Sequence, residues 1–156
     1  MPLRVLVAIG LTAILGPAPA VPSGLQCTAF VLHRESSVLL GKNLDWELGT
    51  GILVTHPRDT SAGRSYGSVT ANQFGVDLPL GGVNEVGLVV EELSYAPARY
   101  PAPEGRPTIS EFGWIQRQLD RFGTVDEVVA ALDDVVIEPL GFGLHYLVAD
   151  RTGDVA

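Results

Sequence analysis

The sequence contains one cysteine, Cys27, in the stretch GLQCTAFVLH, so its thiol has no partner for an intramolecular disulfide. A thiolate is a strong nucleophile and can carry covalent catalysis. If the residues before Cys27 are removed, the same residue also bears a free α-amine, a group with a reference pKa of about 7.7–8.0. Nucleophile and general base would then lie on one residue, which makes Cys27 the leading catalytic candidate.

Two charged residues in the following motif GKNLDW, residues 41–46, can complete such a site. The carboxylate of Asp45 can orient the α-amine, and the ammonium of Lys42 can favour the thiolate. Each residue also has a plain structural interpretation: a small buried hydrophobe for Cys27, a strand-end cap for Asp45 and a solvated charge for Lys42.

Other chemistry is less well supported by the residue patterns. His33, His56 and His145 raise the alternative of a papain-like Cys–His pair, but His33 lies only six residues after Cys27 and His145 is in an apolar stretch expected to pack in the core. A lipid attached to Cys27 would require a small residue before it, and Gln26 is not small. We find no metal-ligand cluster, phosphate-binding loop or nucleotide motif, and expect no cofactor.

The first twenty residues have the features of a secretion signal. Arg4 is followed by the apolar run VLVAIGLTAILG and then by small residues at Ala18–Ala20. We therefore expect a signal peptide at residues 1–20, a short pro-segment or extended signal at 21–26, and a domain at 27–156. The protein should be secreted or periplasmic, without a stable membrane anchor.

The composition indicates one globular domain. The 156 residues are 46% hydrophobic and 18% charged, with a net charge of −8. Such a chain can bury a core, and its acidity argues against a nucleic-acid partner because phosphates would be repelled.

The hydrophobic pattern predicts an α+β fold in which strands come first, then two helices, then strands again. Ser110 and Thr124 are predicted to cap the helices, and Glu127 completes a capping box with Thr124. The expected strands are residues 28–32, 38–40, 52–55, 65–70, 88–93 and 144–149; the expected helices are residues 111–122 and 125–134.

Five finer expectations follow from the same pattern. Gly82, Asn84 and Gly87 are interpreted as turn residues before the fifth strand, and Glu91 and Glu92 within it as one exposed and one inward residue. An apolar stripe of Val125, Val128, Val129 and Leu132 should pack the second helix inward. Residues 95–107 are rich in proline and should form a loop. After residue 149 a turn and the start of a partner strand are expected, so the sequence is interpreted as a fragment of a longer protein.

Five motifs in order resemble the choloylglycine hydrolase family of linear amide hydrolases, which includes bile salt hydrolases and penicillin V acylases. They are CTAFVLH, LLGKNLDW, ILVTHPR, GGVNEVGLVVEELSYA and LHYLVADRTGD. The resemblance runs from Cys27 to Ala156. It implies an N-terminal nucleophile hydrolase with an αββα four-layer sandwich, present here as an incomplete N-terminal portion.

The resemblance assigns roles to four residues. Cys27 falls on the family nucleophile and Asp45 on the aspartate that orients the amine. Lys42 lies where most members carry arginine. Lysine keeps the positive charge but lacks the planar guanidinium and its fixed set of donors. Ser94 falls on the position whose backbone N–H helps form the oxyanion hole. The second oxyanion donor, an asparagine, and a further arginine are expected beyond Ala156.

The resemblance implies an exported amidase that cleaves the linear amide bond of a small N-acyl compound through an acyl-enzyme on Cys27. The substrate class would be a bile-salt conjugate, a penicillin or an N-acyl homoserine lactone. A homo-oligomer of the full-length form is left open, and these 156 residues alone are expected to be inactive. The alternative is a non-catalytic secreted domain that uses the same fold to bind a ligand.

Overall fold

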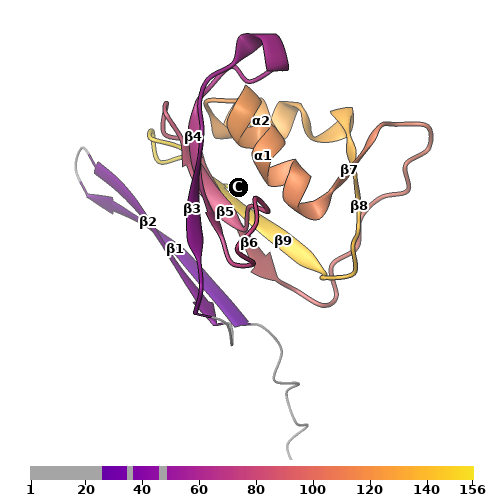
Figure 1. The fold of residues 1–156 in the computed structure, drawn as a ribbon, viewed down its shortest axis with the longest axis horizontal. Helices are drawn as coiled ribbons and strands as arrows, with labels where there is room; N and C mark the ends of the chain where they lie inside the picture. The colour runs from indigo at the N-terminus through magenta and orange to yellow at the C-terminus, as the bar shows by residue number, and fades with distance from the viewer. Residues whose placement is uncertain (1–25, 35–36, 46–48) are drawn as a thin grey trace, which may run out of the picture.

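The computed structural model describes residues 26–34, 37–45 and 49–156 (Figure 1). The predicted signal peptide lies outside the described residues, as do residues 21–25 of the predicted pro-segment and Trp46 of the GKNLDW motif. Among the described residues, no helix has both the length and the apolar character needed to span a membrane.

The chain opens with an antiparallel hairpin of β1 (Gln26–Arg34) and β2 (Ser37–Asp45). Both strands were predicted, and both are longer than predicted because pairing continues through every residue of the two strands. The ring of Phe30 lies against Gly41 on the facing strand, where the absence of a side chain leaves room for it.

A five-stranded antiparallel sheet follows, in the spatial order β3-β4-β5-β6-β9. The prediction that Gly82 is a turn residue was wrong, because it lies within β5 and pairs with β4 and β6. Asn84 ends β5 and begins the predicted turn, where its carbonyl accepts from the amide of Gly87 at 3.0 Å. Gly87 does lie in the turn before β6, at a φ of 92°. The strand bounds are β3 (Ile52–His56), β4 (Ser68–Asn72), β5 (Gly81–Asn84), β6 (Val89–Ser94) and β9 (Leu144–Ala149).

Asn84 links the β5–β6 turn to the end of the first helix through hydrogen bonds. Its side-chain amide donates to the carbonyls of Leu119, at 3.0 Å, and Phe122, at 2.7 Å. Its side-chain oxygen accepts from the amides of Val86 and Leu88. Since the last carbonyls of a helix have no partner within the helix, this buried residue caps α1 from the sheet.

Two helices pack on one face of the sheet, α1 (Glu111–Arg121) and α2 (Val125–Ala130). Ser110 caps α1, and Thr124 with Glu127 forms the predicted capping box of α2. The main core lies between the helices and the sheet; it contains Leu88, Val90, Trp114, Ile115, Leu119, Val125, Val128 and Val148.

The predicted apolar stripe of α2 is only half correct. Val125 and Val128 are buried, whereas Val129 and Leu132 are exposed. The α-helix ends at Ala130 and continues as the 3₁₀ turn η2 (Leu132–Asp134), so the expected helical period does not extend to residue 132. A second 3₁₀ turn, η1 (Thr60–Ala62), precedes β4.

The sequence did not reveal the short parallel pair of β7 (Thr108–Ser110) and β8 (Val136–Glu138), which brackets the two helices. The predicted turn after β9 is confirmed: the chain reverses at Asp150–Gly153, and Val155 forms a bridge with Ala149. The loop predicted at residues 95–107 is also confirmed.

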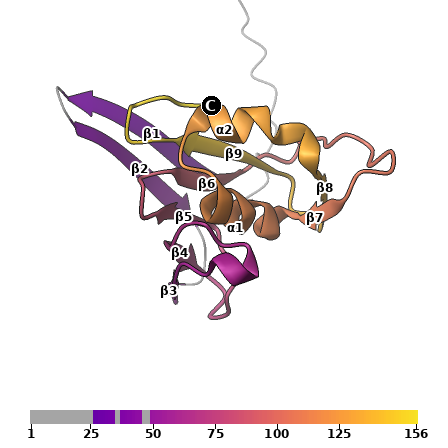
Figure 2. The same cartoon turned by 90° about the horizontal axis from the view of Figure 1, so that it is seen from above.

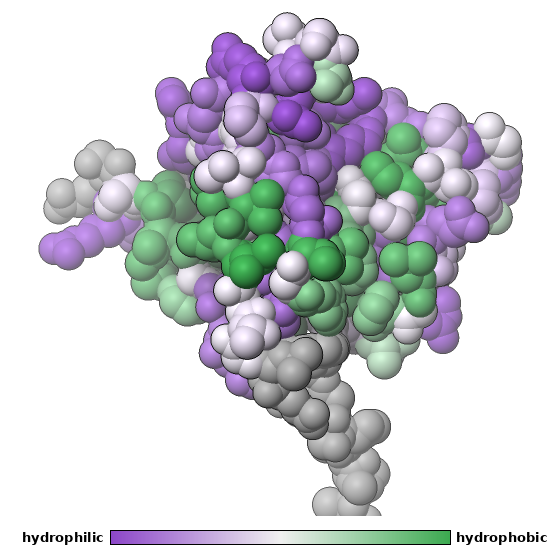
Figure 3. Space-filling model, viewed as in Figure 1, coloured by the Kyte–Doolittle hydropathy of each residue, from purple (hydrophilic) through white to green (hydrophobic). Residues whose placement is uncertain are grey.

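Figures 1 and 2 show the β1–β2 hairpin on one face of the five-stranded sheet and the helices on the other. The described residues thus form three layers of the αββα sandwich implied by the resemblance. The outward face of the hairpin is apolar and exposed at Phe30, Leu32 and Leu39. Apolar surface also gathers beside the hairpin in Figure 3, where Ile52 and Leu53 of β3 are exposed.

Candidate active site

Cys27 lies near the start of β1, directly opposite Leu44 of β2. Residues opposite each other point to the same side of a sheet, as do residues two positions apart along a strand. Cys27 therefore shares a face of the hairpin with Leu44 and Lys42, and all three side chains are half-buried. This is the face that packs toward β6.

Asp45 lies on the other face of the hairpin, where it is exposed and accepts a 2.9 Å hydrogen bond from the side chain of Asn43. In the strand register its partner is Gln26, the residue directly before the predicted nucleophile. Asp45 is therefore next to the peptide bond that would have to be cut to release the α-amine of Cys27.

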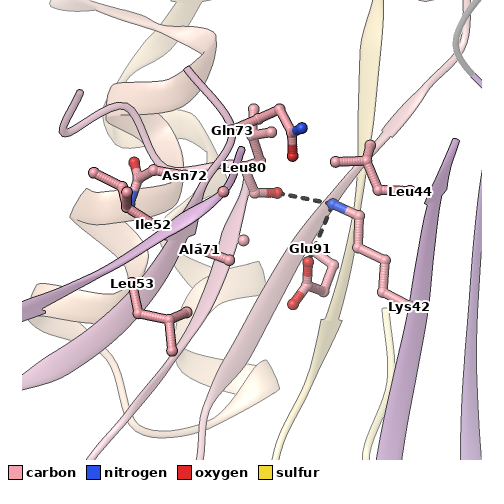
Figure 4. A pocket seen from close by; sticks show the side chains of 11 residues that line it. Lys42, Leu44, Ile52, Leu53, Ala71, Asn72, Gln73, Leu80 and Glu91 are labelled. Atoms are coloured by element: carbon pink, nitrogen blue, oxygen red, sulfur yellow. Dashed lines mark hydrogen bonds and ion pairs between the residues drawn. The ribbon is translucent and has the colours of Figure 1, made fainter. Parts of the chain in front are cut away.

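The ammonium of Lys42 is held by three acceptors between the hairpin and the sheet (Figure 4). Its Nζ lies 3.0 Å from the carbonyl oxygen of Leu80, 3.2 Å from Oε2 of Glu91 and 3.3 Å from Oε1 of Glu92. Leu80 and Glu92 accept hydrogen bonds from this ammonium, and Glu91 forms an ion pair with it. Lys42 can act on the Cys27 thiol through space, but its hydrogen bonds point elsewhere.

The expectation that one of Glu91 and Glu92 would be exposed was wrong. The Glu91 side chain is 15% exposed and the Glu92 side chain 4%, and both pair with the same cation. Burial raises the pKa of both carboxyls, and the nearby Lys42 ammonium partly opposes this rise. Two neighbouring carboxylates repel each other when both are charged. The charge state of Glu91 therefore depends on that of Glu92, and both depend on the Lys42 ammonium.

A cavity of about 370 Å³ opens beside this triad of Lys42, Glu91 and Glu92. Leu44, the cross-strand partner of Cys27, forms part of its wall. Gly81 faces Glu91 across the β5–β6 pair, and a methyl group at this position would overlap the carboxylate. Glycine at residue 81 is therefore what leaves room for the Glu91 carboxylate at the cavity wall.

Ser94 ends β6, opposite Leu144 of β9. It lines a narrow cleft of about 20 Å³ on the other side of Leu44, together with the buried Glu92. The remainder of the cleft is apolar and mainly aromatic: Phe74, Leu80, Phe112, Phe142 and Leu144. The structure thus places Lys42 and Ser94 near Leu44, the cross-strand partner of Cys27, whereas Asp45 lies on the other face of the hairpin.

The loop at residues 95–107 is attached next to this cleft through Tyr100. The Tyr100 hydroxyl donates to the carbonyl oxygen of Leu144 at 2.6 Å and accepts from its amide at 3.2 Å. Glu111, which is fully buried, lies 3.4 Å from the same hydroxyl and accepts from the amide of Leu140. The loop is therefore anchored to the sheet and to the first turn of α1.

The histidines do not form a papain-like pair with Cys27. Six residues along an extended strand span about 20 Å, which places His33 at the far end of β1. His145 was expected to be packed in the core, but it is exposed and lies against Tyr95 with ring centroids 5.3 Å apart. Within the described residues, no group of three or more His, Cys, Asp or Glu side chains is placed to hold a metal ion.

Known proteins resemble this chain in sequence and in fold. Residues 27–156 match the linear amide C-N hydrolases of the choloylglycine hydrolase family. The chain belongs to this family. The matched region of this choloylglycine hydrolase family member begins at Cys27, the predicted nucleophile.

Two penicillin V acylases and a bile acid hydrolase are similar to the chain. The penicillin V acylase of Pectobacterium atrosepticum is 30% identical over 163 residues, which cover 85% of this chain and 43% of that protein. The structure of the penicillin V acylase from Agrobacterium tumefaciens aligns with a TM-score of 0.68 and 28% identity, covering 83% of this chain and 44% of that one.

A mutant conjugated bile acid hydrolase from Clostridium perfringens shares the fold, with a TM-score of 0.65 and 22% identity. The alignment covers 83% of this chain and 46% of that one. The chain therefore spans a little under half of the length of the relatives that it matches. The αββα fold implied by the sequence resemblance is confirmed for the part that the chain represents.

Glu91 and Glu92 were not predicted as residues of the candidate site. Two adjacent glutamates in the apolar strand GLVVEELSYA were a usable signal, because buried carboxylates are rare unless they are paired.

Proposed function

We propose that this family member contributes the nucleophile of an exported amidase, which cleaves the linear amide bond of an N-acyl compound through an acyl-enzyme on Cys27. The observation that carries the proposal is that the family match begins at Cys27, which shares a face with Lys42 at the edge of a cavity. Because the relatives are about twice as long, the activity is proposed for the full-length gene product.

The reaction begins with removal of the residues before Cys27. The new α-amine accepts the thiol proton, and the thiolate attacks the amide carbon to form a tetrahedral oxyanion. The backbone N–H of Ser94 is the proposed donor to that oxyanion. The protonated α-amine then gives its proton to the leaving amine, and water cleaves the resulting thioester to release the acid and the free enzyme.

Asp45 and Lys42 are proposed to support these steps. Asp45 is the strand partner of Gln26, so its carboxylate lies where the released α-amine would be. It can hold the ammonium form of that amine in place. Lys42 contributes positive potential on the face that carries the thiol, although its ammonium already contacts Leu80, Glu91 and Glu92.

The test is to purify the exported full-length gene product and measure its intact mass. The chain should begin at Cys27. The enzyme and its Cys27→Ser variant should then be assayed on penicillin V, a glycine-conjugated bile salt and an N-acyl homoserine lactone. We expect one of these classes to be hydrolysed, with most turnover lost in Cys27→Ser because a hydroxyl is a much weaker nucleophile near neutral pH.

A mature chain that retains residues before Cys27, or a Cys27→Ser variant with wild-type turnover, would refute the mechanism. A protein that binds such a compound without cleaving it would support the alternative of a non-catalytic binding domain.

A further inference from the structure

The strand ladder fixes the direction of the Ser94 amide, the proposed oxyanion donor. In an antiparallel sheet, the amides of successive residues point to opposite edges of a strand. Two residues before Ser94, the amide of Glu92 donates to the carbonyl oxygen of Leu80 at 3.1 Å, on the β5 side of β6. The Ser94 amide therefore also points to this side. Since β5 begins at Gly81, this amide lies past the end of β5 and faces the cleft that Ser94 shares with Leu44.

The residue after Ser94 is bound to the β9 side instead. The amide of Tyr95 donates to the carbonyl oxygen of Gly143 at 2.7 Å. Gly143 has a φ of 60°, and a methyl group there would lie 3.0 Å from the carbonyl oxygen of Tyr95 and 3.1 Å from the Cα of Ala96. Glycine at residue 143 therefore lets the segment after Ser94 lie close against the start of β9.

Tyr100 closes this segment over the outer edge of β9. Hydrogen-bonded and non-hydrogen-bonded pairs alternate along an antiparallel ladder. Because the preceding bond joins the residues just beyond Ser94 and Leu144, these two form a non-hydrogen-bonded pair, and the amide and carbonyl of Leu144 point away from β6. The Tyr100 hydroxyl binds both groups, at 3.2 Å and 2.6 Å. Residues 95–100 are thus held at both ends by Gly143 and Leu144.

The fully buried side chain of Glu111 lies beside this hydroxyl. One of its oxygens is 3.4 Å from Oη of Tyr100, and the other accepts from the amide of Leu140 at 3.0 Å. Leu140 belongs to the segment that carries Phe142, an aromatic wall of the cleft. The contacts of Tyr100 therefore join the two segments that border Ser94.

We propose, building on the amidase function above, that Tyr100 is a positioning residue for the oxyanion. By binding both backbone groups of Leu144, its hydroxyl holds residues 95–100 against β9 and keeps the Ser94 amide directed into the cleft. The hydroxyl itself does not contact the reacting atoms, because it lies at the outer edge of β9 and the Ser94 amide points to the opposite edge of β6. Its removal should weaken stabilisation of the oxyanion without weakening the binding of the intact substrate.

The experiment compares the full-length enzyme with its Tyr100→Phe variant, which lacks only the hydroxyl. The values of kcat and KM are measured on the amide that the wild type hydrolyses among the three classes above. Inhibition is measured with the aldehyde that has the same acyl group, which is phenoxyacetaldehyde for penicillin V, and with the corresponding alcohol.

The aldehyde reports on the oxyanion directly. The Cys27 sulfur bonds to the aldehyde carbon, the C=O double bond becomes a single bond, and the oxygen takes the negative charge and then the proton lost by the thiol. This adduct resembles the tetrahedral intermediate, and such analogues bind through interactions made in the transition state. The alcohol binds without forming a bond to sulfur, so it reports only on ordinary binding.

We expect Tyr100→Phe to lower kcat by about 10- to 100-fold with a change in KM below about threefold, because a displaced donor keeps part of the factor of about 10²–10³ that one oxyanion donor supplies. Inhibition by the aldehyde should weaken by a similar factor, and inhibition by the alcohol should not change. The control is Thr124→Ala, which removes the N-cap of α2 and does not border the cleft. It should also lower the urea midpoint but leave kcat and aldehyde inhibition unchanged.

All variants are assayed at a temperature at which circular dichroism shows each of them to be fully folded. A wild-type kcat in Tyr100→Phe, a rise in KM alone, a loss of kcat with unchanged aldehyde inhibition, or an equal loss of kcat in Thr124→Ala would each overturn the positioning role. Hydrolysis of none of the three amide classes by the wild type would instead refute the amidase function on which this inference rests.

Discussion

Replacing Lys42 by methionine should destabilise the protein strongly and in a pH-dependent way. The substitution preserves most of the side chain's length but leaves Glu91 and Glu92 without their cation. Removal of one partner from a buried ion pair costs about 3–5 kcal/mol. Since Lys42 and Glu91 are 12% and 15% exposed, water can reach part of the triad. We therefore expect a loss near the lower limit, about 3 kcal/mol at pH 8.

The loss should shrink as the pH falls. Both carboxyls already have a pKa raised by burial, so protonation favours the folded state. A raised folded-state pKa gives a contribution to stability that is full below the ordinary glutamate pKa and is lost as the pH rises through the raised value. In the wild type the Lys42 ammonium limits this rise in the pKa of both carboxyls. In Lys42→Met their pKa should rise further, so the stability of the variant should depend more steeply on pH. The difference between variant and wild type should then be smallest near pH 4.5.

The measurement is urea unfolding of the full-length gene product and its Lys42→Met variant, followed by circular dichroism from pH 4.5 to 8. A loss of 3 kcal/mol lowers the urea midpoint by about 1–3 M for typical urea dependences. The control is Arg58→Met, which breaks an exposed pair with Glu85 and should shift the urea midpoint far less. A Lys42→Met loss as small as the control's, or one that grows as the pH falls, would refute the reasoning.

Three further substitutions test the site and its supports. Asp45→Asn should lower kcat about 100-fold or more with unchanged circular dichroism, because the released α-amine loses its carboxylate; wild-type kcat would exclude the assigned role. Gly81→Ala should cost about 1–3 kcal/mol in urea unfolding through overlap with Glu91, and the same substitution made in a Glu91→Ala background should cost much less; an equal cost in both backgrounds would point to a different cause. Tyr100→Phe should cost about 1–3 kcal/mol because the amide and carbonyl of Leu144 lose their partner; a change within the error of the unfolding measurement would show that water replaces the hydroxyl.

Features fixed by local sequence were predictable. The caps of both helices at Ser110 and Thr124 were correctly identified, because the side chain that caps a helix is close in sequence to the amides it binds. The strand at residues 144–149 was predicted with its observed bounds, because a short apolar run there ends at a turn-forming sequence.

Features fixed by distant contacts were not predictable. Asn84 was interpreted as a turn residue because its type favours turns, yet its amide binds carbonyls of α1 that are 35 and 38 residues away. The parallel pairing of β7 with β8 joins two three-residue segments on either side of the helices, and neither segment is long enough to show a period. The burial of both Glu91 and Glu92 depends on Lys42, which is about 50 residues away in the sequence.

The position of Lys42 links the stability of the fold to the proposed catalysis. A cation on the thiol face of the hairpin favours a thiolate at Cys27, but here two carboxylates surround it and reduce the positive potential that the thiol experiences. The same carboxylates hold the ammonium in a fixed position and place acceptors at the cavity wall. In the proposed mechanism, the α-amine must therefore supply more of the activation of the nucleophile than it would beside an unpaired cation. Loss of activity in a Lys42 variant accordingly has two sources, and the unfolding data separate the structural one from the catalytic one.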